Sequence, residues 1–216
     1  MQIQIKICGV NTAQAIDAAV AHGATHVGLV FFPKSPRNVS PEEAAALTAR
    51  LPSHVRAVGL FVDPDAAFID AVRAQVTLQV LQFHGEERPA FTARMGQQHG
   101  LEIWKAIPVK TSQDLKLASK YRGAVHRILF DAKTPDGAAL PGGMGMRFDW
   151  EMLRGYQSPL PWGLAGGLNP GNAAEALRIT GANLLDTSSG VESVPGVKDV
   201  AKIAAFCQAV QHYEQT

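Results

Sequence analysis

The chain has 216 residues, of which 46% are apolar and 18% are charged, and its formal net charge is +1. This length and composition predict one compact domain over residues 1–216 with a single hydrophobic core. The near-neutral charge provides no long-range field for a polyanion, which argues against nucleic acid as a partner.

Membrane, secretion and metal signals are weak throughout the sequence. No apolar run approaches the length of a membrane span, and the first eight residues alternate apolar with polar side chains, unlike a signal peptide. The two cysteines, Cys8 and Cys207, make neither a disulfide framework nor a metal-ligand cluster, and the seven histidines show no paired ligand spacing. We therefore expect a cytoplasmic protein with no metal and no membrane contact.

Short β-rich runs alternate with helical segments along the whole chain. The predicted strands cover 2–8, 26–31, 56–61, 78–83, 102–107, 127–130, 162–164 and 183–186. Amphipathic segments include 11–22, 41–51, 64–73, 172–179 and 197–212. Two helix starts carry strong signals: Ser40-Pro41 followed by a capping-box glutamate at Glu43, and the cap-plus-proline pair Asp63-Pro64.

Strict alternation of strands and helices predicts a parallel sheet with right-handed crossovers. Eight such units favour an α/β fold closed into a single (β/α)₈ TIM barrel with outer helices. The alternative is an open doubly wound sheet, which usually shows a Gly-rich dinucleotide turn after its first strand. The segment Cys8-Gly9-Val10-Asn11 is not such a turn.

The first strand has two chemically different faces. Ile3, Ile5 and Ile7 share one face, which should meet the helices, while Lys6 and Cys8 share the other and should point into the barrel. This places Cys8 at the carboxyl end of the strand, where the active sites of such barrels are assembled. In the fourth strand, Gln82 and His84 are in phase in the same way.

Four reactive groups stand at predicted strand ends: Cys8, His84, Asp131 and Asp186. Each has a structural alternative, because a buried cysteine is often a small apolar residue and an acid or histidine at a strand end can serve as a cap or terminator. Lys6 would be costly inside a barrel without a partner, so we expect a nearby carboxylate, with Asp131 and Asp186 as candidates.

Two segments of small residues predict a phosphate site. GLAGGLN at 163–169 follows the seventh strand, and DTSSG at 186–190 follows the eighth. The loops after these two strands are the usual phosphate site of such barrels, because their backbone N–H groups can converge on an anion. The predicted phosphate ligands are Gly166, Gly167, Ser188, Ser189 and Gly190.

The loops after the second and sixth strands add two further features. Arg37 follows Ser35-Pro36 just before a helix, where an arginine is usually solvated, but its planar fork could hold a substrate carboxylate. Residues 132–147 form the longest irregular stretch and contain Pro141-Gly142-Gly143, which fits an active-site lid.

Taken together, these segments resemble the successive motifs of the phosphoribosylanthranilate isomerase family. In one-letter code they are KICG at 6–9, GLVFF at 28–32 with SPR at 35–37, VGLFV at 58–62, LQFHGE at 81–86, LFD at 129–131, LAGGL at 164–168 and DTSSGVE at 186–192. The resemblance implies an isomerase of tryptophan biosynthesis that performs an Amadori rearrangement of N-(5′-phosphoribosyl)anthranilate without a cofactor.

The resemblance also implies roles for individual residues. Cys8 would be the general base, Asp131 the general acid and Arg37 the anchor of the anthranilate carboxylate, with the two glycine segments holding the phosphate. Lys6, His84 and Asp186 would contribute to substrate binding. The expected partner is therefore a small phosphorylated substrate, bound by a monomer, with a weak homodimer as the alternative.

Three positions depart from the family pattern. Asn11 and Met144 stand where threonine is usual, and Thr187 stands where valine is common. Asn11 can still cap a helix, so we expect a mild effect there. Met144 removes any lid contact that a hydroxyl would make.

The proposed chemistry places opposite demands on two side chains. A cysteine thiol is a weak base at neutral pH, so we expect the Lys6 charge to tune Cys8. Asp131 must instead carry a proton when substrate is bound. The alternatives are another phosphate-binding barrel enzyme of tryptophan or histidine biosynthesis, against which Cys8 argues, and a barrel that binds a phosphorylated metabolite without turnover.

Overall fold

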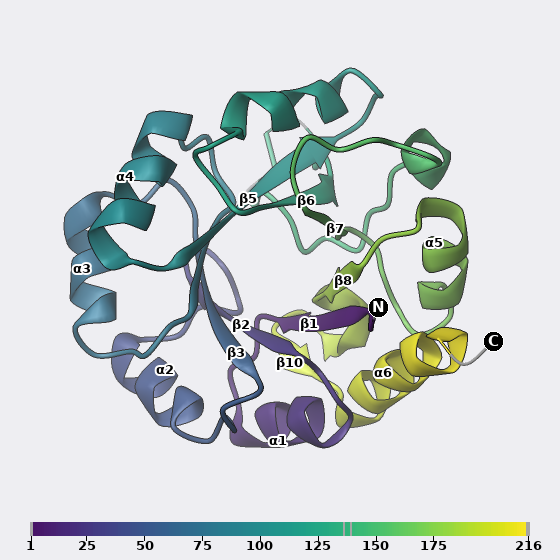
Figure 1. Cartoon of the computed structure of the whole chain (residues 1–216). Helices are drawn as coiled ribbons and strands as arrows, with labels where there is room; N and C mark the ends of the chain where they lie inside the picture. Colours follow the sequence, from purple (N-terminus) through teal and green to yellow (C-terminus); the bar gives the residue numbers. More distant parts are fainter. Residues whose placement is uncertain (1, 136, 139, 215–216) are drawn as a thin grey trace.

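Eight parallel strands form a closed barrel in the order β1-β2-β3-β4-β5-β6-β7-β8, with β8 pairing back onto β1 (Figure 1). The structure is a computed structural model and describes residues 2–135, 137–138 and 140–214. The strands are β1 (Gln4–Cys8), β2 (His26–Phe31), β3 (Arg56–Phe61), β4 (Val80–Phe83), β5 (Glu102–Val109), β6 (Arg127–Ala132), β7 (Trp162–Leu164) and β8 (Leu184–Thr187). The predicted (β/α)₈ barrel is confirmed.

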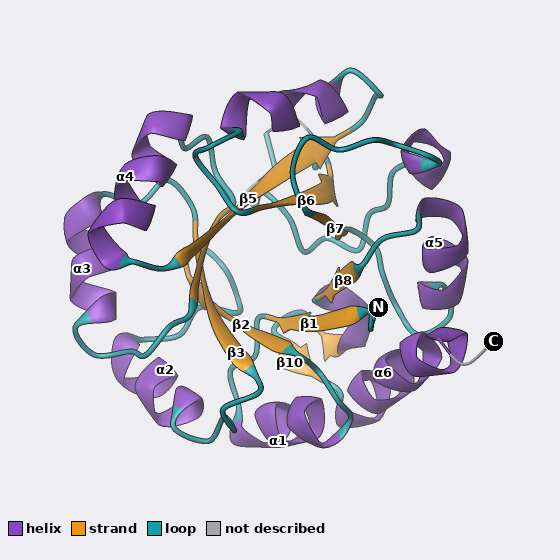
Figure 2. Ribbon diagram, viewed as in Figure 1, coloured by secondary structure: helices purple, strands orange, loops and turns teal. Residues whose placement is uncertain are grey.

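Helices surround the strands as an outer ring (Figure 2). The α-helices are α1 (Ala13–Ala21), α2 (Pro41–Thr48), α3 (Ala66–Arg73), α4 (Pro89–His99), α5 (Ala173–Thr180) and α6 (Val200–Glu214). The 3₁₀ helices η1 (Asp114–Tyr121) and η2 (Trp150–Leu153) take the two places between β5 and β7, and η3 (Ser189–Val191) follows β8. Helix α6 packs against both α1 and α5 and so completes the ring.

The predicted capping box at the start of α2 is confirmed. The Ser40 hydroxyl accepts a hydrogen bond from Glu43 N at 3.1 Å, and the Glu43 carboxylate accepts one from Ser40 N at 2.7 Å. Pro41 occupies the first turn, where its missing N–H costs no helical hydrogen bond.

Two predicted caps were wrong. Helix α3 is capped by Asp65, which accepts from Phe68 N at 2.7 Å, while the Asp63 carboxylate accepts from Glu86 N and Asp63 has a φ of 45°. Helix α1 is capped by Thr12 rather than Asn11, whose amide donates to Gly196 O. In both cases the side chain predicted as a cap makes a tertiary contact at the carboxyl end of the barrel instead.

The last helix begins later than the predicted residue 197. Val197–Lys198 form the short strand β10, which pairs antiparallel with β9 (Glu192–Val194), and α6 starts only at Val200. The β9–β10 hairpin carries Glu192 and Lys198 into the buried part of the molecule. It therefore adds polar side chains near the end of β8.

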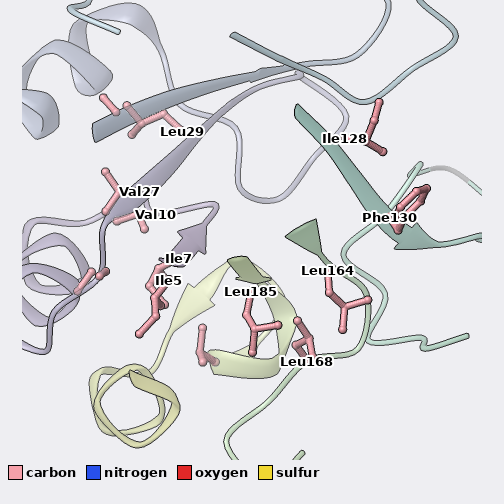
Figure 3. Close-up of a cluster of buried hydrophobic side chains, with 14 of the residues drawn as sticks. Ile5, Ile7, Val10, Val27, Leu29, Ile128, Phe130, Leu164, Leu168 and Leu185 are labelled. Carbon is pink, nitrogen blue, oxygen red and sulfur yellow. The ribbon is translucent and has the colours of Figure 1, made fainter. Parts of the chain in front are cut away.

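The buried apolar residues form three clusters, of which the smallest consists of Cys8, Val30 and Leu60. The largest one fills the space between strands and helices and includes Ile5 and Ile7 of β1, as predicted, together with Phe130 and Leu185 (Figure 3). Inside the barrel, alternate strand residues form a second cluster, here called the inner plug: Val58, Val80, Trp104, Ala106, Leu129 and Leu184. The plug closes the barrel between its two ends.

A polar layer lies on the amino-terminal side of the inner plug. His26 is buried, its ring centroid lies 5.0 Å from that of Trp104, and the Arg127 guanidinium lies over the same indole. Arg56 pairs with Glu102 in this layer. Burial, together with the charges of Arg56 and Arg127, lowers the pKa of His26 to about 3.

Candidate active site

A cavity opens at the carboxyl ends of the strands. Nine predicted site residues line it: Cys8, Arg37, His84, Asp131, Gly166, Gly167, Asp186, Ser188 and Ser189. Gly190 lines an adjoining cavity that shares Arg37 and Ser189 with the first, and Lys6 is fully buried. Residues spread over nearly the whole sequence thus meet at one end of the barrel.

Lys6 and Asp186 form a buried ion pair between β1 and β8. Lys6 Nζ lies 2.8 Å from Asp186 Oδ2, so the carboxylate partner predicted for Lys6 is Asp186 and not Asp131. Burial alone would lower the pKa of Lys6, but the charges of Asp186 and Cys8 and the hydrogen bond to Asp186 together outweigh it and raise that pKa. Lys6 therefore remains a cation beside the cavity.

The second oxygen of Asp186 takes no part in the ion pair with Lys6. Asp186 Oδ1 is buried and has no hydrogen-bond partner among the described residues. Burial also raises the pKa of this carboxyl, against the opposing effect of Lys6. A buried oxygen without a partner is costly, and a hydroxyl of a bound sugar would remove that cost.

Cys8 lies beside Lys6, but its thiol is not activated in this structure. Burial raises the pKa of Cys8, and the charge of Lys6, which acts in the predicted direction, does not fully offset it. The close approach of the two side chains depends on Gly28 of β2. A Cβ at Gly28 would lie 2.8 Å from Cys8 Sγ and 3.2 Å from Lys6 Cε, so a larger residue there would displace both.

Asp131 is held at the end of β6 by two contacts. Its Oδ1 accepts a hydrogen bond from Ala132 N at 2.8 Å, and its Oδ2 lies 3.0 Å from His84 Nε2. The loop after β6 covers this pair, because a Cβ at Gly142 would lie 2.8 Å from Asp131 Oδ2 and 2.9 Å from His84 Cε1. His84, Asp131 and Gly142 therefore form one wall of the cavity.

A buried lysine and glutamate behind His84 were not predicted as site residues. Lys105 Nζ donates to Gly85 O at 2.7 Å and lies 3.1 Å from Glu87 Oε2. The same carboxylate accepts hydrogen bonds from the N–H groups of Asp63 and Gly85. These bonds fix the peptide that follows His84. A lysine between the apolar residues Trp104 and Ala106 of the fifth strand was the sequence signal for Lys105.

Arg37 is buried rather than solvated. Its Nε and Nη2 bind the two oxygens of Glu192 at 2.7 and 2.8 Å, and Nη2 also donates to Gly143 O in the lid at 3.0 Å. Glu192 binds Lys198 Nζ at 2.7 Å through Oε1. Burial would raise the pKa of Glu192, but the hydrogen bond from Arg37 and the Lys198 charge outweigh it, so that pKa is lowered.

The two glycine segments lie side by side at the mouth of the cavity. Gly166 and Gly167 have φ values of 84° and 65°, and a Cβ at Gly190 would lie 1.9 Å from Leu168 O. The N–H groups of Gly166, Gly167 and Ser189 donate to no acceptor in the described part of the chain. The side-chain hydroxyl of Ser188 donates a hydrogen bond to Cys8 O at 3.0 Å.

The three departures from the family pattern have different consequences. Thr187 donates its hydroxyl to Leu168 O at 2.7 Å, which ties β8 to the loop after β7. Asn11 reaches the β9–β10 hairpin through Gly196 O. Met144 lines the cavity and is half exposed.

The described residues contain no group of three or more His, Cys, Asp or Glu side chains arranged to hold a metal ion. None of the helices in residues 2–135, 137–138 and 140–214 is long and apolar enough to cross a membrane. Acids, bases and backbone N–H donors gather at the mouth of the barrel. Together with the fold they define a (β/α)₈-barrel enzyme, a class whose active sites lie at this end of the barrel.

Comparison with known proteins specifies this class. The family model of N-(5′-phosphoribosyl)anthranilate (PRA) isomerase matches residues 5–209. The N-(5′-phosphoribosyl)anthranilate isomerase of Rhodospirillum centenum is 54% identical over 207 residues, which cover 95% of this chain and 97% of that protein. The chain belongs to the N-(5′-phosphoribosyl)anthranilate isomerase family and is an isomerase of tryptophan biosynthesis.

Solved structures agree with this assignment. Phosphoribosyl anthranilate isomerase from Thermotoga maritima superposes with a TM-score of 0.87 at 34% identity, covering 98% of this chain and 100% of that one. A phosphoribosyl anthranilate isomerase in complex with reduced 1-(o-carboxyphenylamino)-1-deoxyribulose 5-phosphate gives a TM-score of 0.85 at 32% identity, with the same coverage. That complex shows a relative of this chain binding a phosphorylated small molecule.

Proposed function

We propose that this cavity converts N-(5′-phosphoribosyl)anthranilate to 1-(2-carboxyphenylamino)-1-deoxyribulose 5-phosphate, with Asp131 as general acid and Cys8 as general base. The observation that carries the proposal is that both side chains line one cavity, although they belong to strands far apart in sequence. One acid and one base suffice for the reaction, because it moves protons without a net change in composition.

Asp131 acts in the first step. Opening the furanose requires a proton on the ring oxygen, so Asp131 Oδ2 donates one as the bond from C1′ to that oxygen breaks. The nitrogen lone pair then forms a protonated Schiff base at C1′. His84 Nε2, at 3.0 Å from Asp131 Oδ2, holds the carboxyl in place and can share its proton before substrate binds.

Cys8 acts in the second step. The Schiff base withdraws electrons from C2′, so the sulfur can remove the C2′ proton and leave an enolamine. The enolamine becomes the ketone when that proton returns from Cys8 to C1′ and the C2′ hydroxyl gives its proton to the Asp131 carboxylate, which restores both groups. Because the pKa of Cys8 is raised, the reactive thiolate is a minor form, and the Lys6 cation stabilises it as it forms.

The remaining residues bind the substrate in this proposal. Arg37 holds the anthranilate carboxylate and Asp186 Oδ1 accepts a sugar hydroxyl, with Lys6 fixing the Asp186 carboxylate. The phosphate lies against the N–H groups of Gly166, Gly167, Ser188, Ser189 and Gly190. The reaction as written needs no cofactor and no metal.

We also propose that the chain works as a monomer of one domain, in the cytoplasm and without nucleic acid. One chain supplies every group that the reaction uses, and Cys8 and Cys207 are both free thiols, as suits a reducing compartment. Specific activity should then be independent of protein concentration, and sedimentation should give a single species of 23.1 kDa.

Loss of phosphoribosylanthranilate fluorescence, followed without metal or nucleotide, tests the catalytic roles. Cys8→Ser and Asp131→Asn should each lower kcat by about 10²–10⁴-fold with little change in KM. The double variant should lose less than the product of the two single losses, because both groups serve one reaction.

Cys207→Ser is the matched control, since it makes the same change at the other buried cysteine, on α6. The variant should keep its kcat. Near-normal turnover in Cys8→Ser would show that Cys8 is not the general base and serves only as a small apolar residue in the wall of the cavity.

A further inference from the structure

The guanidinium of Arg37 is bound along one edge before any substrate arrives. Glu192 occupies Nε and Nη2, and Gly143 O takes the other hydrogen of Nη2. The remaining atom is Nη1, which no hydrogen bond within the described residues uses. Arg37 thus offers a substrate one nitrogen in a fixed place instead of a freely rotating fork.

Glu192 is itself held from several sides. Its Oε1 receives a hydrogen bond from Lys198 Nζ, and its Oε2 receives one from Gly196 N at 3.2 Å. Lys198 also donates to Ser188 O at 3.0 Å, directly beside the predicted phosphate loop. The carboxylate is therefore anchored to the β9–β10 hairpin and to the loop after β8, both outside the strand ends that supply the acid and the base.

We propose that Glu192 is a positioning residue that directs Arg37 Nη1 toward the carboxylate of the substrate. The inference rests on the proposed function, in which Arg37 binds that carboxylate. Glu192 contacts no reacting atom in this scheme. It fixes the side chain that recognises the aromatic acid, and Lys198 keeps Glu192 in place.

Glu192 could act through its negative charge or through the position in which it holds Arg37. The two roles predict opposite changes in ligand affinity when Glu192 is replaced, so an experiment can distinguish them. Arg37 and Lys198 with Glu192 leave one net positive charge in the cluster. Replacing Glu192 by glutamine would raise that charge to two. If Glu192 acted only through its charge, the variant would bind an anionic substrate more tightly. If Glu192 acts by position, the variant binds it more weakly.

The test uses two ligands that differ at one group. The first is reduced 1-(o-carboxyphenylamino)-1-deoxyribulose 5-phosphate, and the second is the same molecule without the ring carboxylate. For Glu192→Gln we expect about tenfold weaker binding of the carboxylated ligand, within the range of coupling between contacting residues, and unchanged binding of the other. Calorimetry measures both constants, and KM should rise with little change in kcat.

Two further variants complete the design. Glu151→Gln is the matched control, because Glu151 pairs with Arg154 at 2.6 Å but on the exposed surface of η2. It should alter neither constant. Glu192→Asp keeps the charge but shortens the reach, so it should show the same selective loss, and it serves as the test variant if Glu192→Gln does not fold.

The outcomes separate this inference from the proposed function. If Arg37→Ala leaves the preference for the carboxylated ligand unchanged, Arg37 is not the anchor and the proposed role of Arg37 fails. If Arg37→Ala abolishes the preference while Glu192→Gln and Glu192→Asp keep it or strengthen it, the positioning role of Glu192 is overturned. Equal weakening of both ligands would also overturn it, because that is the result of general structural damage.

Discussion

His84 Nε2 and Asp131 Oδ2 lie 3.0 Å apart and join the end of β4 to the end of β6. Behind them, Lys105 and Glu87 fix the peptide that follows His84, so the histidine cannot shift without disturbing buried charges. This arrangement makes His84 the support of the proposed general acid.

Replacing His84 by glutamine should therefore lower kcat about 10- to 100-fold, the size of effect that misplacing a reacting group produces, with a smaller change in KM. The fluorescence assay measures both parameters. His99→Gln is the control, since His99 Nε2 lies 3.2 Å from Asp70 Oδ1 in a similar pair on the outer ring. An unchanged kcat in His84→Gln would show that Asp131 needs no such support.

Alanine at the two lid glycines should affect different parameters. A Cβ at Gly142 would meet Asp131 and His84, so Gly142→Ala should mainly lower kcat. A Cβ at Gly143 would lie 2.7 Å from Arg37 Nη1, so Gly143→Ala should mainly raise KM. Gly137→Ala is the control for a positive φ in the same loop, because no other residue that the structure describes lies within 4 Å of its Cβ position. Equal effects of all three variants would indicate a general lid defect.

Phosphate binding gives the next prediction. In crystals grown with sulfate or phosphate, the anion should lie against the N–H groups of Gly166, Gly167 and the Ser188-Ser189-Gly190 segment. Gly190→Ala should displace Leu168 and weaken competitive inhibition by inorganic phosphate. Gly155→Ala, where a Cβ would meet no described residue within 4 Å, should not. An anion at the opposite rim of the barrel, with these loops empty, would contradict the assignment.

The buried His26 predicts a pH dependence of stability. Its pKa falls from the ordinary 6.5 to about 3 on folding, so the unfolded chain binds one more proton between these values. Stability should therefore fall as the pH drops from 6.5 toward 3, by about 1.4 kcal/mol per pH unit from this group. The free energy of unfolding, measured with urea at several pH values in this window, should change less steeply with pH for His26→Gln than for the unaltered protein. The same dependence on pH in both proteins would mean that His26 does not cause the effect.

The sequence predicted the barrel well because each strand repeats the same local pattern. The alternation in β1 separates Ile5 and Ile7 from Lys6 and Cys8, and this separation does not depend on the rest of the chain. Predictions that depended on distant contacts were less successful. Asp63 and Asp65 are both plausible caps, and the choice is made by Glu86, which uses the Asp63 carboxylate.

In the candidate site, too, local sequence patterns gave correct predictions and contacts between distant residues did not. Strand position identified Cys8 and Asp131 as lining residues, but it left two possible partners for Lys6 and gave no reason to pair Arg37 with Glu192, 155 residues away. Burial of Arg37 could not be foreseen either, since it depends on a hairpin whose second strand, Val197–Lys198, the sequence pattern had assigned to the start of a helix.

The inner plug determines how molecules move through this enzyme. Trp104 and its neighbours close the barrel beneath the cavity, so substrate and product must share the mouth that residues 140–146 line. Each product molecule has to leave before the next substrate can enter. Product that stays bound in the cavity therefore excludes substrate, so product should act as a competitive inhibitor.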